Sequence, residues 1–251
     1  MNLVIAGQVN VWLKENRVKT VGLIGGMSWE STLSYYKGLN EGVKEALGGL
    51  HSAKINLHSV NFAEIEKLQR EGRWQETAEI LSSAAKGLEA AGSDFFMICT
   101  NTMHKVAGEV VDSVSMPILH IADATAKQLK VDNVSKVGLL GTAFTMEQEF
   151  YQSRLIDLHN IDVVIPEDED RALVHRVIYD ELCLGRISAD SRREYVRIVA
   201  SLAKNGAQAV ILGCTEIALL IGQDDTEVPL YDTTAIHVDE AVRVALGKSS
   251  L

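Results

Sequence analysis

The chain has 251 residues, of which 47% are apolar and 23% charged, with a formal net charge of −10. This length accommodates two ordinary α/β domains, and the negative charge argues against nucleic acid or an anionic membrane surface as the main partner. Three cysteines, Cys99, Cys183 and Cys214, form no CxxC pair, so neither disulfides nor zinc are indicated and a cytoplasmic location fits best. No apolar run is long enough to span a membrane.

Short apolar runs alternate with helical patterns along the chain. The predicted strands cover residues 21–26, 95–99, 137–142 and 209–213. The predicted helices cover residues 31–47, 75–91, 169–184 and 191–204. Strands that alternate with helices are typical of parallel sheets, which place ligands at the carboxyl ends of their strands.

Three phrases occur twice in the same order. VGLIGG at residues 21–26 returns as VGLLGT at 137–142, and MPILH at 116–120 resembles VPLYD at 228–232. Between them, the strand that ends at Thr100 corresponds to the strand that ends at Cys214. The offsets are 116, 112 and 114 residues, respectively, which indicates an internal duplication.

We therefore predict an α/β protein with two similar domains, each a mainly parallel sheet flanked by helices. The strand near Leu230 is expected to return to the first sheet, so domain 1 would be discontinuous. The predicted boundaries are 18–116 plus 228–251 for domain 1 and 117–227 for domain 2. Residues 1–17 are interpreted as an N-terminal extension, since their apolar part is too short for a signal-peptide core.

The duplication brings Thr100 and Cys214 to equivalent strand ends. A buried free cysteine is usually structural, but a thiol before a helix start would lie near amides that lower its pKa from about 8.5 toward neutrality. Cys99 should point to the opposite face of its strand and into the core, and Cys183 is also expected to be structural. His104 is equally compatible with a helix histidine and with a proton partner.

The glycine phrase at residues 22–28 does not fit the dinucleotide-binding GxGxxG pattern. The turn at Gly26 and Met27 is more compatible with amides that hold a carboxylate near a helix start. No serine-hydrolase, zinc-protease or P-loop phrase occurs, and the histidines lack ligand spacing, so neither a cofactor nor a metal is indicated.

Three phrases, GGMSWE at 25–30, CTNTMH at 99–104 and GCTE at 213–216, resemble the aspartate/glutamate racemase family, specifically its L-aspartate/glutamate-specific branch. The resemblance extends from about Thr20 to nearly the end of the chain. It implies a cofactor-independent enzyme, usually a homodimer, with the active site in the cleft between two α/β domains. Its substrate would be an amino-acid dicarboxylate.

Members of that family generally carry two opposed cysteines as acid and base. Here the first of these positions is Thr100, as in the L-specific branch, so the resemblance implies Thr100 and Cys214 as the catalytic pair. The substrate-binding residues implied by position are Met27, Gln69, Thr100, Asn101, Thr102 and Thr215. Some relatives add an arginine after the second strand and a lysine near Cys183; neither is plainly present, although Arg70 and Arg73 are nearby alternatives.

Racemisation requires two proton carriers on opposite faces of the α-carbon, and two facing halves supply that arrangement. A threonine hydroxyl is a far weaker base than a thiolate, so the enantiomers should be handled unequally. The resemblance to the L-specific branch implies that the L-enantiomer is preferred. The alternatives are another superfamily isomerase, such as a hydantoin racemase or a maleate-type isomerase, and an amino-acid-binding protein without turnover.

Overall fold

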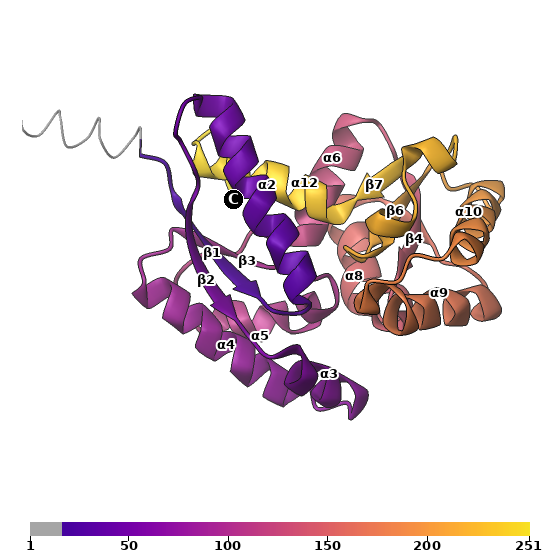
Figure 1. Cartoon of the computed structure of the whole chain (residues 1–251), viewed down its shortest axis with the longest axis horizontal. Coiled ribbons are helices and arrows are strands. Elements are labelled where there is room, and N and C mark those ends of the chain that lie inside the picture. The colour runs from indigo at the N-terminus through magenta and orange to yellow at the C-terminus, as the bar shows by residue number, and fades with distance from the viewer. Residues whose placement is uncertain (1–16) are drawn as a thin grey trace, which may run out of the picture.

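The computed structural model describes residues 17–251, so most of the predicted N-terminal extension lies outside the described residues. The strands are β1 (Thr20–Gly25), β2 (Lys54–Ser59), β3 (Phe95–Ile98), β4 (Lys136–Gly141), β5 (Asp162–Val164), β6 (Ala209–Gly213) and β7 (Leu230–Asp232). They form two separate sheets, which define the first half (β1–β3) and the second half (β4–β7) of the molecule (Figure 1).

The two sheets share one topology. The first has the order β2-β1-β3 and the second β5-β4-β6-β7, and every pairing is parallel. An isolated parallel bridge between Phe96 and Ile118 gives the first sheet the counterpart of β7. The predicted duplication into two similar α/β halves is therefore confirmed at the level of strand order.

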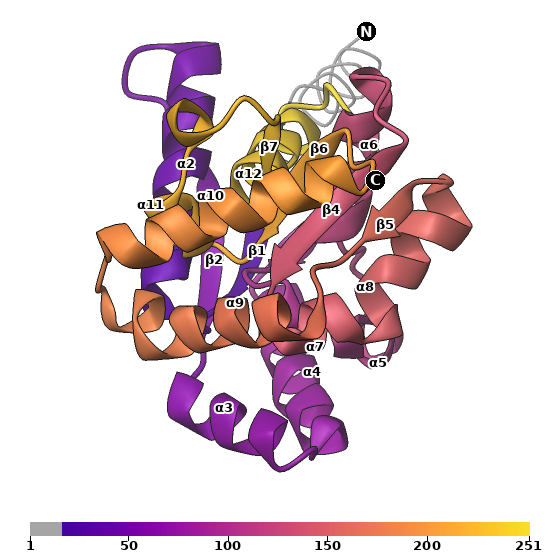
Figure 2. The ribbon, with the colours of Figure 1, turned by 90° about the vertical axis from the view of Figure 1, so that its right-hand side faces the viewer.

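Helices cover both faces of each sheet. The α-helices are α2 (Trp29–Leu47), α3 (Phe62–Arg70), α4 (Trp74–Ala90), α5 (Ala107–Asp112), α6 (Ile121–Val131), α7 (Ala143–Glu147), α8 (Glu149–Ser153), α9 (Asp168–Asp180), α10 (Ala189–Lys204), α11 (Ile217–Leu220) and α12 (Thr233–Ala245). The short helical turns are η1 (Thr102–Val106), η2 (Arg154–Leu158), η3 (Leu182–Leu184) and η4 (Gln223–Asp225). Figure 2 shows α9 and α10 lying in front of β4. The four long predicted helices are present, although the third ends at Asp180 before η3.

The prediction that the strand near Leu230 joins the first sheet is wrong. Leu230, Tyr231 and Asp232 pair with β6 in the second sheet. The chain returns to the first half one element later, through α12, whose N-cap is Asp232. The domain boundaries themselves remain a prediction.

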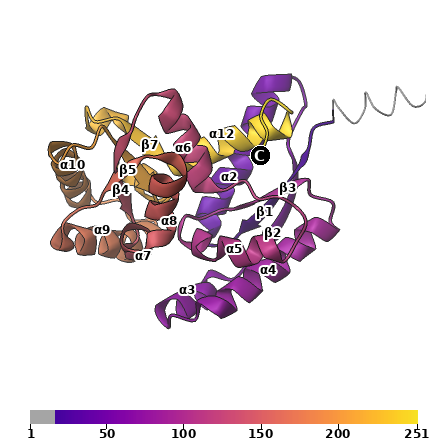
Figure 3. The same ribbon diagram turned by 180° about the vertical axis from the view of Figure 1, so that it is seen from behind.

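The last helix of each half packs on the sheet of the other half. Val238 and Ala241 of α12 share a core with Tyr35 of α2 and with β1 and β3. In the same way, α6 packs on β4 and β6. Figures 1 and 3 show α12 running from the second half to lie beside α2. The exchanged helices hold the two halves together, and the strand ends of the two halves face each other across the pocket.

Close packing of α2 against α12 requires a small residue at the contact. A Cβ atom added to Gly42 would lie 2.8 Å from a methyl carbon of Val242, which is closer than Cβ atoms approach other atoms in real structures.

No helix within residues 17–251 combines the length and apolar character that a membrane span requires.

Candidate active site

One pocket lies between the carboxyl ends of the two sets of strands. The first half contributes Met27, Ser28, Phe62, Gln69, Thr100, Asn101 and Thr102. The second half contributes Thr142, Ile178, Tyr179, Cys183, Gly213, Cys214, Thr215 and Glu216. All six residues predicted to bind substrate and both members of the predicted catalytic pair therefore line the same pocket.

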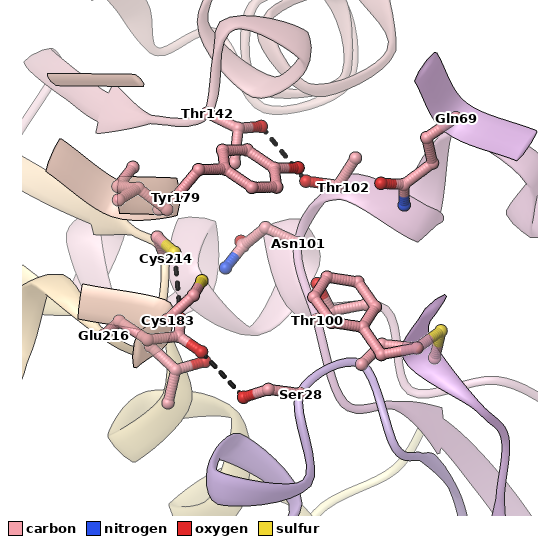
Figure 4. Close-up of a pocket in the computed structure, with 15 residues that line it drawn as sticks. Ser28, Gln69, Thr100, Asn101, Thr102, Thr142, Tyr179, Cys183, Cys214 and Glu216 are labelled. Atoms are coloured by element: carbon pink, nitrogen blue, oxygen red, sulfur yellow. Dashed lines mark hydrogen bonds between the residues drawn. The ribbon is translucent and has the colours of Figure 1, made fainter. Parts of the chain in front are cut away.

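Thr100 and Cys214 enter this pocket from different halves. Thr100 follows β3 and Cys214 follows β6, at the equivalent strand ends predicted from the repeat. Figure 4 shows Cys214 with Cys183 and Glu216 on one side, and Thr100 with Ser28 and Gln69 on the other. A small molecule between them would have a hydroxyl on one side and a thiol on the other.

The Cys214 thiol is held by a carboxylate. Cys214 Sγ donates a hydrogen bond of 3.0 Å to Glu216 Oε2. Burial raises the pKa of this thiol well above its usual value, and the negative charge of Glu216 raises it further. The pKa of Cys214 is therefore raised, and not lowered toward neutrality as its place before a helix predicted.

The geometry explains why the helix-start argument fails for Cys214. The helix that follows, α11, covers only Ile217–Leu220, so few peptide dipoles add up at its start. Glu216 places a full negative charge within hydrogen-bond distance of the sulfur, which outweighs that dipole.

Glu216 also bridges the two halves. Its Oε1 accepts a hydrogen bond of 2.9 Å from Ser28 Oγ, and Ser28 caps the start of α2. Ser31, on the same helix, lies 2.8 Å from the Thr215 hydroxyl. Neither Ser28 nor Glu216 was predicted as a site residue, although both lie inside the phrases that carry the family resemblance.

In the turn at Gly26 and Met27, the Gly26 amide is not free to hold a substrate carboxylate. Gly26 adopts φ of +92°, and a side chain there would collide with the Val60 backbone. Its N–H donates to Thr32 Oγ1 at 2.8 Å, so that amide is already used inside the first half. Met27 reaches the pocket wall as predicted.

Two carboxamides lie in the pocket with an unpaired oxygen. Gln69 and Asn101 are 4% and 3% exposed, and their Oε1 and Oδ1 atoms are buried without a hydrogen-bond partner within residues 17–251. Thr102 is paired instead, at 3.1 Å from the Thr142 hydroxyl across the two halves. Buried carbonyl oxygens usually have a donor, so these two atoms indicate where a ligand would bind.

His104 is a structural histidine. Its Nδ1 lies 2.8 Å from the Thr100 carbonyl oxygen, and its Nε2 accepts from the Ile121 backbone N–H at 3.3 Å. Because Nε2 accepts, Nδ1 carries the proton and donates it to Thr100. Burial lowers the pKa of His104 to about 4, so this ring is neutral and supports the backbone behind Thr100.

The other two cysteines differ in position. Cys99 is fully buried in the core beneath the first sheet, as predicted, and burial raises its pKa. Cys183 packs against the second core but also lines the pocket, although only a structural role was predicted for it. Burial raises the pKa of Cys183 to about 12, so its thiol is neutral.

Neither arginine suggested by the sequence lines the pocket. Arg73 pairs with Glu71 and Glu76 on the surface, and the exposed Arg70 lies 4.0 Å from Glu66.

Residues 17–251 contain no group of three His, Cys, Asp or Glu side chains placed to hold a metal ion.

Comparison with known proteins agrees with this arrangement. The chain is 55% identical to a candidate Asp/Glu racemase from Yersinia pestis (TM-score 0.86, covering 91% of this chain and 99% of that one). It is 36% identical to an aspartate racemase homologue from Pyrococcus horikoshii (TM-score 0.79, covering 90% and 99%). It is also 26% identical to a broad-specificity amino-acid racemase from Bacillus subtilis over 68% of this chain and 73% of that protein. A family model described as Asp/Glu/hydantoin racemase matches residues 24–241. The chain thus belongs to the Asp/Glu/hydantoin racemase family, as an isomerase of the racemase type.

Proposed function

We propose that this protein is a cofactor-independent amino-acid racemase that exchanges the α-proton through Cys214 and Thr100. The observation that carries the proposal is the position of these two side chains. They follow equivalent strands of the two halves and line one pocket from different sides. Two-base inversion of an α-carbon needs this arrangement of proton carriers.

The Cys214–Glu216 hydrogen bond gives the thiol a way to become a base. In the proposed reaction, Glu216 accepts the thiol proton, and the Cys214 thiolate then removes the proton from the substrate α-carbon. The electron pair of the broken C–H bond moves into the carboxylate, and the Thr100 hydroxyl delivers a proton to the opposite face. The electron pair returns to the α-carbon as this new C–H bond forms. Solvent then restores the Thr100 proton, and Glu216 releases the proton it took from the thiol to solvent. Because the threonine hydroxyl is a very weak acid and base, this half of the cycle should be the slower one.

Substrate entry requires the pocket to open. Its free volume is about 30 Å³, room for roughly one or two water molecules. Side chains of the two halves meet around the pocket through the Ser28–Glu216 and Thr102–Thr142 hydrogen bonds. We expect these contacts to break as the halves separate, and to re-form around the substrate so that water is excluded.

Aspartate or glutamate would need a partner for the second carboxylate, and no arginine or lysine is among the pocket residues. Preference for the L-enantiomer, the homodimer and the cytoplasmic location remain predictions.

An exposed apolar stripe on α2, formed by Trp29, Leu33 and Tyr36, is a surface that a second copy could cover.

Cys214→Ala should strongly slow α-proton exchange. Loss of the stronger of the two proposed proton carriers should lower kcat/KM by about 10²- to 10⁴-fold, measured by NMR as exchange of the α-proton with deuterium. Cys99→Ala is the matched control, because Cys99 is buried away from the pocket. Exchange at the wild-type rate in Cys214→Ala would show that the base has been assigned to the wrong residue.

Thr100→Cys should make the two enantiomers behave more alike. A thiol at this position is a much better proton carrier than a hydroxyl, so the ratio of the exchange rates for the D- and L-enantiomers should move toward one. Thr100→Ser keeps a hydroxyl and should leave the ratio close to that of the wild type. If Thr100→Cys leaves the ratio unchanged, the opposed-base arrangement is refuted.

Glu216→Gln should lower the pKa of the Cys214 thiol. The substitution removes the nearby negative charge, which is one of the causes that raise this pKa, whereas burial remains. At a given pH more thiolate would be present, so alkylation of Cys214 should accelerate and its pH midpoint should move down. Mass spectrometry distinguishes Cys214 from the other cysteines, and Glu41→Gln, on an exposed surface, is the control. A midpoint that rises or stays in place would contradict the proposed pairing.

A further inference from the structure

A serine hydroxyl ties the strand end that carries Thr100 to the strand end that carries Cys214. Ser31 Oγ donates a hydrogen bond of 3.2 Å to the carbonyl oxygen of Cys99, the residue before Thr100. The same Ser31 Oγ lies 2.8 Å from Oγ1 of Thr215, the residue after Cys214. One side chain therefore connects the two loops from which the proposed proton carriers project.

The neighbours of Ser31 fix the direction of this tie. A carbonyl oxygen can only accept, so the single proton of the Ser31 hydroxyl is used on Cys99, and Thr215 must donate to Ser31. Thr234 in turn donates to Thr215 Oγ1 at 3.2 Å. Each of these three hydroxyl protons has a defined acceptor, and Ser31 is the member of the chain that joins the two halves.

Thr233 forms a second tie on the other side of the same two proton carriers. Asn101 Nδ2, one residue after Thr100, donates to Thr233 Oγ1 at 3.0 Å. The Thr233 hydroxyl donates to the Leu212 carbonyl oxygen at 2.9 Å, two residues before Cys214. Thr100 and Cys214 are thus each held on both sides through hydroxyl groups that are not among the pocket residues.

The two hydroxyls project from the first turns of two helices that are bonded to each other. Ser31 lies on α2 and Thr233 on α12, which run side by side (Figures 1 and 3). One turn further along each helix, the Tyr35 hydroxyl lies 3.0 Å from His237 Nδ1. His237 Nε2 lies 2.8 Å from the Leu119 carbonyl oxygen, so Nε2 carries the ring proton and Tyr35 donates to Nδ1. The helix pair therefore forms one frame for both hydroxyls.

Both ties are shielded from water. Ser31 is 3% exposed and Thr233 is fully buried. Removal of either hydroxyl would leave buried donors and acceptors unpaired, which is more costly than the hydrogen bond is stabilising. The loops that carry Thr100 and Cys214 would then shift until these groups find new partners.

Resting on the proposed racemase function, we propose that Ser31 and Thr233 are positioning residues that set the separation between Thr100 and Cys214. Neither hydroxyl lines the pocket, so both act through the residues that flank the two proton carriers. Once one carrier has removed the α-proton, delivery of a proton by the other inverts the carbon. Return of a proton by the first carrier restores the starting enantiomer. The separation of the carriers therefore decides how often removal of the α-proton leads to inversion.

The test measures two rates on one substrate in deuterium oxide, with L-aspartate, L-glutamate and L-alanine as probes. Polarimetry reports inversion, and NMR of the remaining L-enantiomer reports exchange without inversion. In full-length Ser31→Ala and Thr233→Val, we expect kcat for inversion to fall by about 10-fold or more with a smaller change in KM. The ratio of exchange without inversion to inversion should rise by about threefold or more, because a displaced second carrier delivers its proton less often.

Two controls separate positioning from a loss of stability. Thr233→Ser keeps the hydroxyl and should keep the wild-type ratio. Thr125→Val makes the same change at an equally buried threonine, whose hydroxyl donates to the Ile121 carbonyl oxygen at 2.8 Å within α6, and it should also keep the ratio. An unchanged ratio in Ser31→Ala and Thr233→Val, or an equal rise in Thr125→Val, would overturn the proposal.

Crystal structures separate this inference from the racemase function itself. The distance between Thr100 Oγ1 and Cys214 Sγ should differ by about 0.5 Å or more between the wild type and the double variant Ser31→Ala/Thr233→Val, since catalytic groups must be held within that tolerance. An unchanged distance would overturn the positioning role whatever the activity. Absence of α-proton exchange by the folded wild type with either enantiomer of any common amino acid would refute the racemase function, whereas a changed distance would still support the two ties.

Discussion

The hydrogen bond from Ser28 to Glu216 joins the two halves of the molecule beside the Cys214 thiol. It connects residues 188 positions apart, one at the start of α2 and the other two residues after Cys214. The other oxygen of the same carboxylate accepts a hydrogen bond from the Cys214 thiol. The relative position of the halves and the protonation of the thiol are therefore coupled through one side chain. Opening of the pocket would break the first contact and leave Glu216 with only the second.

This coupling is possible because of the exchange of helices between the halves. With α12 packed on the first sheet and α6 on the second, neither half has a complete core alone. The strand ends consequently meet at a short distance, where hydroxyl, amide and carboxylate groups from both halves bond to one another. Burial of the thiol follows, and its raised pKa follows from burial and from Glu216.

The repeated phrases made the two strand ends predictable. Local patterns that are visible in one sequence predicted the alternation of strands and helices. They also predicted the equivalence of Thr100 and Cys214 and the burial of Cys99. The sequence could not predict which of the two sheets the three-residue strand β7 joins. The pairing of so short a strand depends on which edge strand is accessible once the rest of the chain has folded. The predicted lowering of the Cys214 pKa was wrong because it considered only the helix that follows. That helix is about one turn long, and the negative charge of the Glu216 carboxylate, two residues from Cys214, has the larger effect on the pKa. The sequence could not predict that the oxygens of Gln69 and Asn101 are unpaired. Their orientation depends on the contacts of the two amide nitrogens with Met103 and Thr233, and on the position of the facing half.

A crystal structure with a bound, slowly reacting amino-acid analogue tests the central claim most directly. The relevant quantities are the positions of Thr100 Oγ1 and Cys214 Sγ relative to the α-carbon. We predict that the two atoms lie on opposite faces of the α-carbon, each within about 4 Å of it, close to the separation from which a proton can be transferred. Both atoms on the same face, or either one turned away from the ligand, would contradict two-base exchange by this pair.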